Sequence, residues 1–407
     1  MKKLLLLLLA ASPALALDFQ DPRALVARAL ETNPSLTRLR AEVSAARERV
    51  APAESLPNPM LMTGIQNKQI DLRDDEMMTM YMVGASQTFV RPEKRAARRD
   101  AAELEARAIE LQLDSVRAEI ERDVRLTWYE LAATDSAIAT TQTVREMIDA
   151  IVASARVRYE VGNAAQADVI RAQLQLSNLD HDVLRLKGQR RATVARLLTL
   201  LDLPVDTGVP FTPLPEETAQ LTIGRETIPP PSHPAIVALQ TESQRAKAEI
   251  ALANADLRPD VDVEAQYGFR RAQRDMFSVV ARIELPLRSK TLVEPRVREA
   301  MLRHEAAEAA IEEMRRAIAI GMTDAVAAHD SATEQMRFHH EVLVPQAQLA
   351  FESTLAAYQT GKAQFDAILD TEAAYLELRL QYVEFLADHV RAIVNYEALR
   401  DGARGSL

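Results

Sequence analysis

The sequence predicts a mostly α-helical chain made of two similar halves, each of which carries one membrane β-hairpin. Three observations predict this fold class. Helix-favouring residues dominate, because glycine occurs only 11 times and aromatic residues make up 4% of the 407 residues. No proline interrupts the chain between Pro92 and Pro204. The same order of motifs also appears twice, about 200 residues apart, which indicates an internal duplication.

The first 16 residues have the pattern of a secretory signal peptide. Lys2 and Lys3 precede an unbroken run of leucines, and Ala14-Leu15-Ala16 fits a cleavage site, so the mature chain is expected to start near Leu17. The leucine run is shorter than the ~20 apolar residues of a membrane-spanning helix, and no other stretch approaches that length. We therefore expect any entry into a membrane to use strands.

In each half, a helical segment leads to a predicted hairpin. Asn33-Pro34 opens the first segment and His233-Pro234 opens the second, and a later proline ends each of them, at Pro59 and Pro259. From Val261 onward, apolar residues alternate with polar ones, which is the period of a strand. Residues 77–90 and 276–287 are the candidate second strands of the two hairpins.

Long amphipathic helices are predicted after the hairpins. Apolar residues recur at spacings of three and four after Pro92, and charged residues occupy the other faces, as in a coiled coil. The first helix breaks at 159–163 and resumes to about Leu201. The second begins near Glu294, breaks at 358–362 and continues to about Leu399. A helix from residue 92 to 162 measures roughly 105 Å, which suits a tube or coiled-coil barrel better than a globule.

The number of strands bears on assembly. Two hairpins supply four strands, whereas known transmembrane barrels have about eight or more, and an open edge in lipid leaves backbone groups unsatisfied. Three chains would supply about twelve strands. This inference holds only if the hairpins meet lipid; the alternative is a soluble hairpin packed against the helices.

Composition and motifs argue against several functional classes. The net charge of -10 disfavours nucleic acid as a partner, and the absence of cysteine removes thiolate chemistry. The sequence has no Gly-rich phosphate loop, GxSxG elbow or HExxH zinc motif. We therefore predict no enzyme, no cofactor, and no catalytic or metal site residue. His339-His340 is expected to be a solvated surface pair.

The duplicated motifs resemble those of the TolC family of outer-membrane efflux proteins over essentially the whole mature chain. The most specific matches are Arg158-Tyr159-x-x-Gly162 with Asp168-Val169, and Pro345 with Tyr358-x-x-Gly361 and Leu369-Asp370. The resemblance implies a homotrimer with a twelve-stranded β-barrel, four strands from each chain, and a long α-helical coiled-coil barrel. The expected domains are a signal peptide (1–16), a first repeat (17–203), a Pro-rich linker near the equator (204–233), a second repeat (234–400) and a C-terminal tail (401–407).

The resemblance also implies a function. The chain is expected to be the passive outer-membrane exit duct of a tripartite efflux system, located in the cell outer membrane and extending into the periplasm. Its partners would be a periplasmic adaptor (membrane fusion) protein, an inner-membrane pump of the proton-driven resistance-nodulation-division type, and outer-membrane lipid. Cargo stays open among drugs, polypeptides and metal ions, with heavy-metal cations one candidate. The alternative is a periplasmic coiled-coil adaptor, which would need a lipoyl-like β-domain that we do not find in the sequence.

The resemblance places the functional residues at the two helical turns. Asp370 matches a position whose acidic ring constricts the pore in the family, and Asp168 and Arg171 are the corresponding pair in the first half. Arg171 would pair with an acid to hold the mouth shut, while Asp168 is equally suited to cap the helix after the turn. The expected adaptor contacts are Tyr159, Gly162, Asn163, Tyr358, Gly361 and Lys362. Neither turn has the Val-Gly-Leu sequence of the best-known member, so the resemblance does not identify the adaptor.

The first hairpin is rich in methionine, with Met60, Met62, Met77, Met78, Met80 and Met82. Thioethers bind soft ions such as Cu(I), and some members of the family export copper or silver. Methionine is also a flexible apolar filler that suits lipid-facing or packing positions. The sequence leaves both interpretations open.

Overall fold

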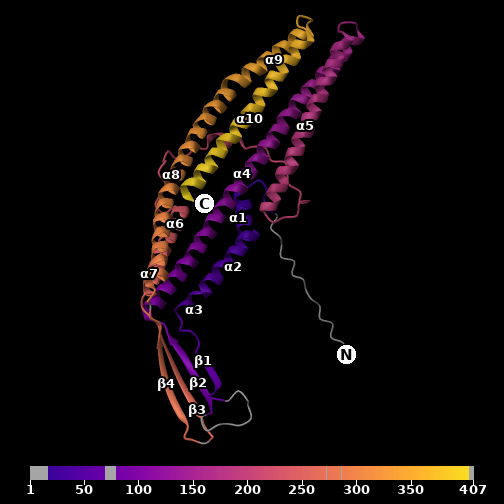
Figure 1. Cartoon of the computed structure of the whole chain (residues 1–407). Coiled ribbons are helices and arrows are strands. Elements are labelled where there is room, and N and C mark those ends of the chain that lie inside the picture. The colour runs from indigo at the N-terminus through magenta and orange to yellow at the C-terminus, as the bar shows by residue number, and fades with distance from the viewer. Residues whose placement is uncertain (1–16, 69–78, 272, 286, 403–407) are drawn as a thin grey trace, which may run out of the picture. The chain divides into compact units, whose positions relative to one another are not determined.

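The computed structural model describes residues 17–68, 79–271, 273–285 and 287–402 (Figure 1). The predicted signal peptide, most of the first hairpin loop with Met77 and Met78, and residues 403–407 of the predicted tail lie outside the described residues. The described chain divides into two compact units. The first contains Ser115–His233 with the residues up to Thr37 and from Arg316, and the second contains Arg38–Asp114 and Pro234–Arg315.

The second unit holds both hairpins and the helices beside them. Helices α2 (Pro34–Glu48) and α3 (Val50–Glu54) precede strands β1 (Met60–Gln66) and β2 (Met80–Phe89). Helix α6 (Pro234–Ala255) precedes β3 (Val261–Phe269), β4 (Met276–Ile283) and the short α7 (Ser289–Leu292). The predicted order of helix and then hairpin is therefore confirmed in both halves.

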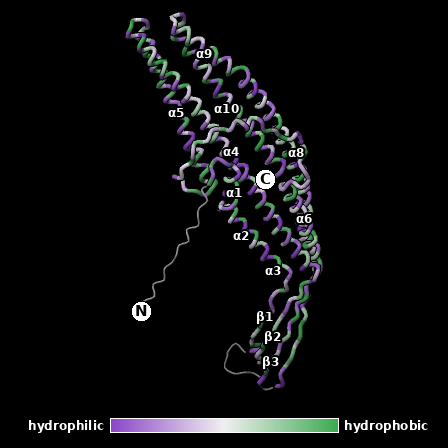
Figure 2. Tube along the Cα trace, turned by 180° about the vertical axis from the view of Figure 1, so that it is seen from behind, coloured by the Kyte–Doolittle hydropathy of each residue, from purple (hydrophilic) through white to green (hydrophobic). Residues whose placement is uncertain are grey.

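The first unit is helical. It contains α1 (Pro22–Thr32), α5 (Gln166–Leu200), the short 3-10 helix η1 (Glu216–Gln220), α9 (Val344–Gln359) and α10 (Phe365–Asp401). Helices α4 (Pro92–Glu160) and α8 (Glu294–Phe338) have residues in both units, and the first residues of α2 also belong to the first unit. Figure 2 shows hydrophilic and hydrophobic residues interleaved along these helices, as the amphipathic pattern predicts. Among the described helices, none is both long enough and apolar enough to cross a membrane.

The four strands form one antiparallel sheet in the order β1-β2-β3-β4. The strands end where their partners end: β4 stops at Ile283, which pairs with Val261, the first residue of β3. The predicted strand 276–287 is therefore too long. Within 77–90, the described strand covers Met80–Phe89. Among the described residues, β1 and β4 are edge strands, each paired on one side only.

The pairing register gives the sheet two different faces. Directly opposed residues point to the same side, and side chains alternate along each strand. The apolar face carries exposed aliphatic and aromatic side chains: Leu61, Ile65, Tyr81, Val83, Phe89, Tyr267, Phe269, Phe277, Val279 and Ile283. The polar face, which is more shielded along β2 and β3, carries Ser86, Thr88, Asp262, Glu264, Gln266, Ser278 and Arg282. The alternation predicted for β3 is thus confirmed.

A buried ion pair attaches the Pro-rich linker to the helices of the first unit. Asp135 of α4 is fully buried and lies 2.6 Å from Arg190 Nε of α5. The Thr212 backbone N–H donates to the other Asp135 oxygen at 2.8 Å, and Arg190 donates to the carbonyl oxygens of Val209 and Pro210. Because a buried charge is tolerated only when it is paired and hydrogen-bonded, this cluster fixes the position of linker residues 209–212.

The second long helix contains a feature that the sequence pattern does not reveal. A π-helical turn, His339–Leu343, separates α8 from α9 just before Pro345. Proline cannot donate the helical hydrogen bond and its ring crowds the preceding turn, so the wider π-turn accommodates it. The expectation of a solvated histidine pair is wrong for His339, which is buried and bonded to Gln335 O and Gln381 Oε1. His340 is exposed, as expected.

The two helical turns share one backbone design. At the end of α4, the Asn163 N–H donates to Arg158 O at 2.7 Å and the Gly162 N–H to Tyr159 O at 3.0 Å. At the end of α9, Lys362 and Gly361 make the same two bonds to Ala357 and Tyr358. The glycines have φ of 77° and 74°, so each is the left-handed residue of a Schellman ending. The glycine prediction is therefore confirmed at both turns.

Replacing Gly162 with alanine tests this backbone requirement. We expect Gly162→Ala to destabilise the α4–α5 turn by about 1 kcal/mol, because a Cβ is strained at positive φ although no atom lies within 4 Å of it. Gly188→Ala, within α5, is the matched control. It also meets no atom within 4 Å, so it should stabilise its helix by up to about 1 kcal/mol. Local amide hydrogen exchange measures both effects, and equal effects of the two substitutions would contradict this account.

Candidate functional site

Arg158 connects the two helical turns within the first unit. Its guanidinium donates from Nη1 to Tyr358 O at 2.7 Å and to Gln359 O at 2.9 Å, and from Nη2 to Asn163 O at 3.3 Å. The first two acceptors are carbonyl groups at the C-terminus of α9, where the helix dipole favours a cation. The guanidinium also lies 4.6 Å from the centre of the Tyr358 ring, within cation–π range. One side chain therefore holds both turns, which lie about 200 residues apart in sequence.

The two tyrosines of the repeated turn motif have different environments. Tyr159 is 45% exposed, whereas Tyr358 is only 4% exposed and packs edge-on against Phe365. Burial raises the pKa of the Tyr358 phenol, the nearby Asp168 carboxylate raises it further, and Arg158 lowers it. The duplicated motif thus contains one surface tyrosine and one core tyrosine, a difference that its matching sequence does not indicate.

Tyr358 belongs to the apolar core beneath the turns. Residues from α4, α5, α9 and α10 contribute to this core: Val144, Ile148, Ile151, Val152, Ala172, Leu179, Phe351, Tyr358, Phe365, Ile368 and Tyr375. Their recurrence at helical spacing is the amphipathic pattern of the sequence. This core is rigid support for the side chains that the turns present.

The three predicted gate residues lie just after the turns. Asp168 is in the first turn of α5, but the N-cap is Ala165, which makes no side-chain cap bond, so the capping interpretation of Asp168 is wrong. Arg171 forms an ion pair with Asp366, an acid in the first turn of α10 that the sequence comparison of the two halves did not single out. Asp370 lies one helical turn beyond Asp366 and is exposed. The structure therefore links Arg171 to α10 through Asp366.

A buried carboxyl group lies two residues beyond Asp370. Glu372 is fully buried, and Gln175 Nε2 of α5 donates to its Oε2 at 2.8 Å. Its other oxygen is also buried and has no partner among the described residues. Burial raises the pKa of Glu372 to about 7, and the bond from Gln175 partly offsets this. The sequence signal was available, because Phe365, Ile368, Glu372 and Tyr375 follow the spacing of a buried stripe.

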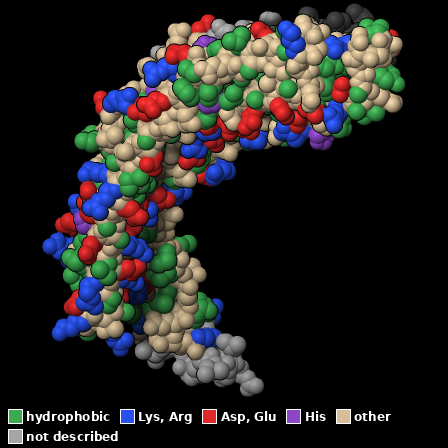
Figure 3. Space-filling view, turned by 90° about the horizontal axis from the view of Figure 1, so that it is seen from above, with side chains coloured by type: hydrophobic (Ala, Val, Ile, Leu, Met, Phe, Trp, Pro, Cys, Tyr) green, Lys and Arg blue, Asp and Glu red, His purple; other side chains and the backbone are tan. Residues whose placement is uncertain are grey.

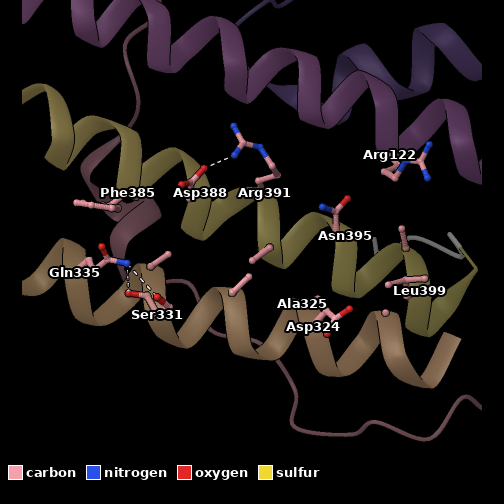
Figure 4. A pocket seen from close by; sticks show the side chains of 15 residues that line it. Arg122, Asp324, Ala325, Ser331, Gln335, Phe385, Asp388, Arg391, Asn395 and Leu399 are labelled. Carbon is pink, nitrogen blue, oxygen red and sulfur yellow. Dashed lines mark hydrogen bonds and ion pairs between the residues drawn. The ribbon is translucent and has the colours of Figure 1, made fainter. Parts of the chain in front are cut away.

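A groove of about 670 Å³ lies between α8 and α10 (Figure 4). Small residues line it, among them Gly321, Ala325, Ala332, Ala392 and Ala398, and Arg122 of α4 contributes as well. The labelled Asp388 and Arg391 form an ion pair with one another. The lining offers space for a packed side chain or helix but contains no nucleophile beside a general base.

The surface charges are mixed in sign. Figure 3 shows acidic and basic side chains interspersed over the face in view, and many of them are paired along one helix, as in Arg38–Glu42 and Arg303–Glu299. Within the described ranges, no group of three or more His, Cys, Asp or Glu side chains is placed to hold a metal ion.

Comparison with known proteins identifies the family. The model of the outer membrane efflux protein family matches residues 25–202 and 231–399, which is most of the chain. No curated protein matches the sequence. Solved structures with the same fold include VceC of Vibrio cholerae, with 18% identity, a TM-score of 0.77, and coverage of 93% of this chain and 95% of that one.

Two further structures agree with this fold. The outer-membrane channel OprN has 18% identity and a TM-score of 0.78, and the match covers 94% of this chain and 91% of that one. The open state of the Neisseria gonorrhoeae MtrE channel has 17% identity and a TM-score of 0.74, with coverage of 94% and 90%. The family consists of channels rather than enzymes, and its members are generally trimeric and work with an adaptor and an inner-membrane pump. The chain belongs to the outer membrane efflux protein family and is an outer-membrane channel that extends into the periplasm.

Proposed function

We propose that three copies of this chain form the passive exit duct of a tripartite efflux system whose pump is of the proton-driven resistance-nodulation-division type. The observation that carries the duct is the two-faced sheet. Its apolar face suits lipid and its polar face suits an aqueous lumen. The edge strands β1 and β4 each have one unpaired side among the described residues, so a neighbouring copy can complete the hydrogen bonding that lipid cannot supply.

The proposed mouth of the duct is formed by the two helical turns. Asp370, Asp168 and Arg171 are the proposed gate residues, and the exposed Tyr159, Gly162, Asn163, Gly361 and Lys362 are the proposed adaptor contacts. Because the Tyr358 side chain is buried, we assign it the role of supporting the turn, through Arg158, in place of direct contact. Ion pairs at the mouth have the advantage that they can open without disturbing the apolar core below.

The first test addresses the acidic ring. We expect Asp370→Ala to raise single-channel conductance and to weaken block by multivalent cations at least about tenfold. The substitution removes three carboxylates from around a narrow pore axis, and a tenfold loss of cation affinity corresponds to only about 1.4 kcal/mol. Planar-bilayer recording of the purified trimer provides the measurement. Glu384→Ala, an exposed acid further along α10, is the control and should change neither quantity. If Asp370→Ala behaves like this control, Asp370 is not at the gate.

The second test addresses the ion pair between Arg171 and Asp366. Both side chains are about half exposed, so the pair contributes no more than about 1 kcal/mol and should weaken at high salt. We expect Arg171→Glu to raise the open probability of the channel, and the double substitution Arg171→Glu with Asp366→Arg to restore closure in part. Single-channel recordings at low and high salt compare the variants. Additive effects of the two substitutions would show that the pair does not hold the mouth closed.

The third test concerns Glu372. The carboxyl has a pKa of about 7 when folded and 4.5 as its ordinary value, so folding takes up a proton between these pH values. The free energy of local unfolding should therefore fall as pH rises from about 4.5 to 7. Above pH 7 the loss is complete and amounts to about 1–3 kcal/mol. Glu372→Gln should remove this dependence and stabilise the segment at pH 8. Hydrogen exchange of α10, corrected for intrinsic rates, measures it; the same pH dependence in the variant would contradict the assignment.

A further inference from the structure

The methionines of the sheet share one face, and it is the polar one. On β1 and β2 this face carries Met60, Met62, Met80 and Met82, whose cross-strand partners are Ser86, Gly84, Gln66 and Gly64. Met276 of β4, which is opposite Gly268, is on the same face. This is the face of Asp262, Glu264, Gln266 and Arg282, as the cross-strand partners Ser86 with Glu264 and Gly84 with Gln266 show. The apolar face, by contrast, carries leucine, isoleucine, valine and aromatic residues. Contact with lipid therefore does not explain the methionines.

Glycines make room for the methionine side chains. Met82 lies between Gly64 of β1 and Gly268 of β3, and Gly268 in turn is opposite Met276. The sulfur of Met80 occupies the space that a Cβ on residue 268 would need, and the Met82 methyl group lies 3.9 Å from the corresponding point on residue 64. Met82 and Met276 are the cross-strand neighbours of Gly268 on its two sides, each about one strand spacing (~4.8 Å) away, and the Met80 side chain lies over Gly268 between them. The absence of a side chain at Gly268 thus lets the thioethers of Met80, Met82 and Met276 gather around one point of the sheet.

The chemistry of this face favours one class of ion. The chain has 13 methionines and no cysteine, so thioethers are its soft sulfur ligands. Thioethers prefer soft metal ions such as Cu(I) over hard ions such as Mg²⁺. The acids Asp262 and Glu264 are on the same face and both pair with Arg282, further along β3 from Gly268. A monovalent soft cation therefore meets suitable ligands on this face.

We propose that the methionine-bearing face of the sheet is a binding surface for soft monovalent metal ions, Cu(I) or Ag(I), with Met62, Met80, Met82 and Met276 as the ligands. The proposal rests on the proposed function, because that function places the polar face in the lumen of the duct. It names one cargo class for which the channel wall itself provides ligands. The thioethers of several chains would form a ring of weak sites along the path.

The experiment measures Ag⁺ binding to the purified trimer in detergent, in chloride-free buffer, by equilibrium dialysis and elemental analysis. We expect saturable binding that falls at least tenfold in affinity when Met62, Met80, Met82 and Met276 are all replaced by leucine, which conserves volume. The control replaces Met147 of α4 and Met301 of α8, two exposed helical methionines, with leucine and should bind Ag⁺ like the wild type. Met77 and Met78 stay in place in every protein.

Two further measurements separate this proposal from the proposed function. Conductance of the variant in potassium nitrate should match that of the wild type, and Mg²⁺ should bind all the proteins equally weakly. Unchanged Ag⁺ binding in the fourfold variant, or none in the wild type, overturns the metal proposal and leaves the duct intact. A wild-type trimer that conducts nothing overturns the duct. If the fourfold variant does not assemble, Met82→Leu and Met276→Leu are measured singly, each with a smaller loss of affinity expected.

Discussion

Backbone hydrogen bonding at the two edges of a four-stranded sheet constrains the rest of this molecule. Strands β1 and β4 each present a row of N–H and C=O groups on one side, and a hydrocarbon environment offers these groups no partner. In the proposed duct, a neighbouring copy supplies the further strands that the sheet needs beside it. In a trimer, each helical turn would be present three times around one axis. A single carboxylate per chain then becomes a ring.

The helical turns are the proposed gate. Each turn ends its helix with the same Schellman geometry, so Gly162 and Gly361 provide equivalent scaffolds in the two halves. The side chains on those scaffolds have diverged. Arg158 has its partners at the opposite turn, and Tyr358 is buried beneath it, whereas Tyr159 remains at the surface. After the duplication, the first turn therefore supplies the arginine and the second turn supplies the carbonyl groups that accept from it. The ion pair of Arg171 with Asp366 lies outside the apolar core, so breaking it costs little free energy.

The sequence predicts most of the fold because the relevant signals are local. Proline and glycine positions mark where helices begin and end, and the alternation from Val261 identifies a strand without any tertiary information. The features that the sequence does not predict depend on contacts between different helices or strands. The π-turn before Pro345 relieves a steric clash, but the apolar pattern of the sequence continues through it. Asp366 is the partner of Arg171 only because α5 and α10 pack side by side, which the sequence does not show. The end of β4 likewise follows from where β3 begins. The alternation within one strand shows which of its own residues share a face. Only the pairing register shows which residues of the neighbouring strands are on that face, so the sequence alone does not place the methionines on the polar face.

The type of sulfur ligand on the polar face matters for transport as well as for selectivity. A conducting pathway needs sites that bind well enough to draw an ion in and weakly enough to release it. Thiolates hold soft metals tightly and would trap them, whereas thioethers are neutral and weak, and the chain has 13 methionines and no cysteine. Weak soft ligands are therefore compatible with passage, and Gly268 provides the space around which the Met80, Met82 and Met276 side chains lie.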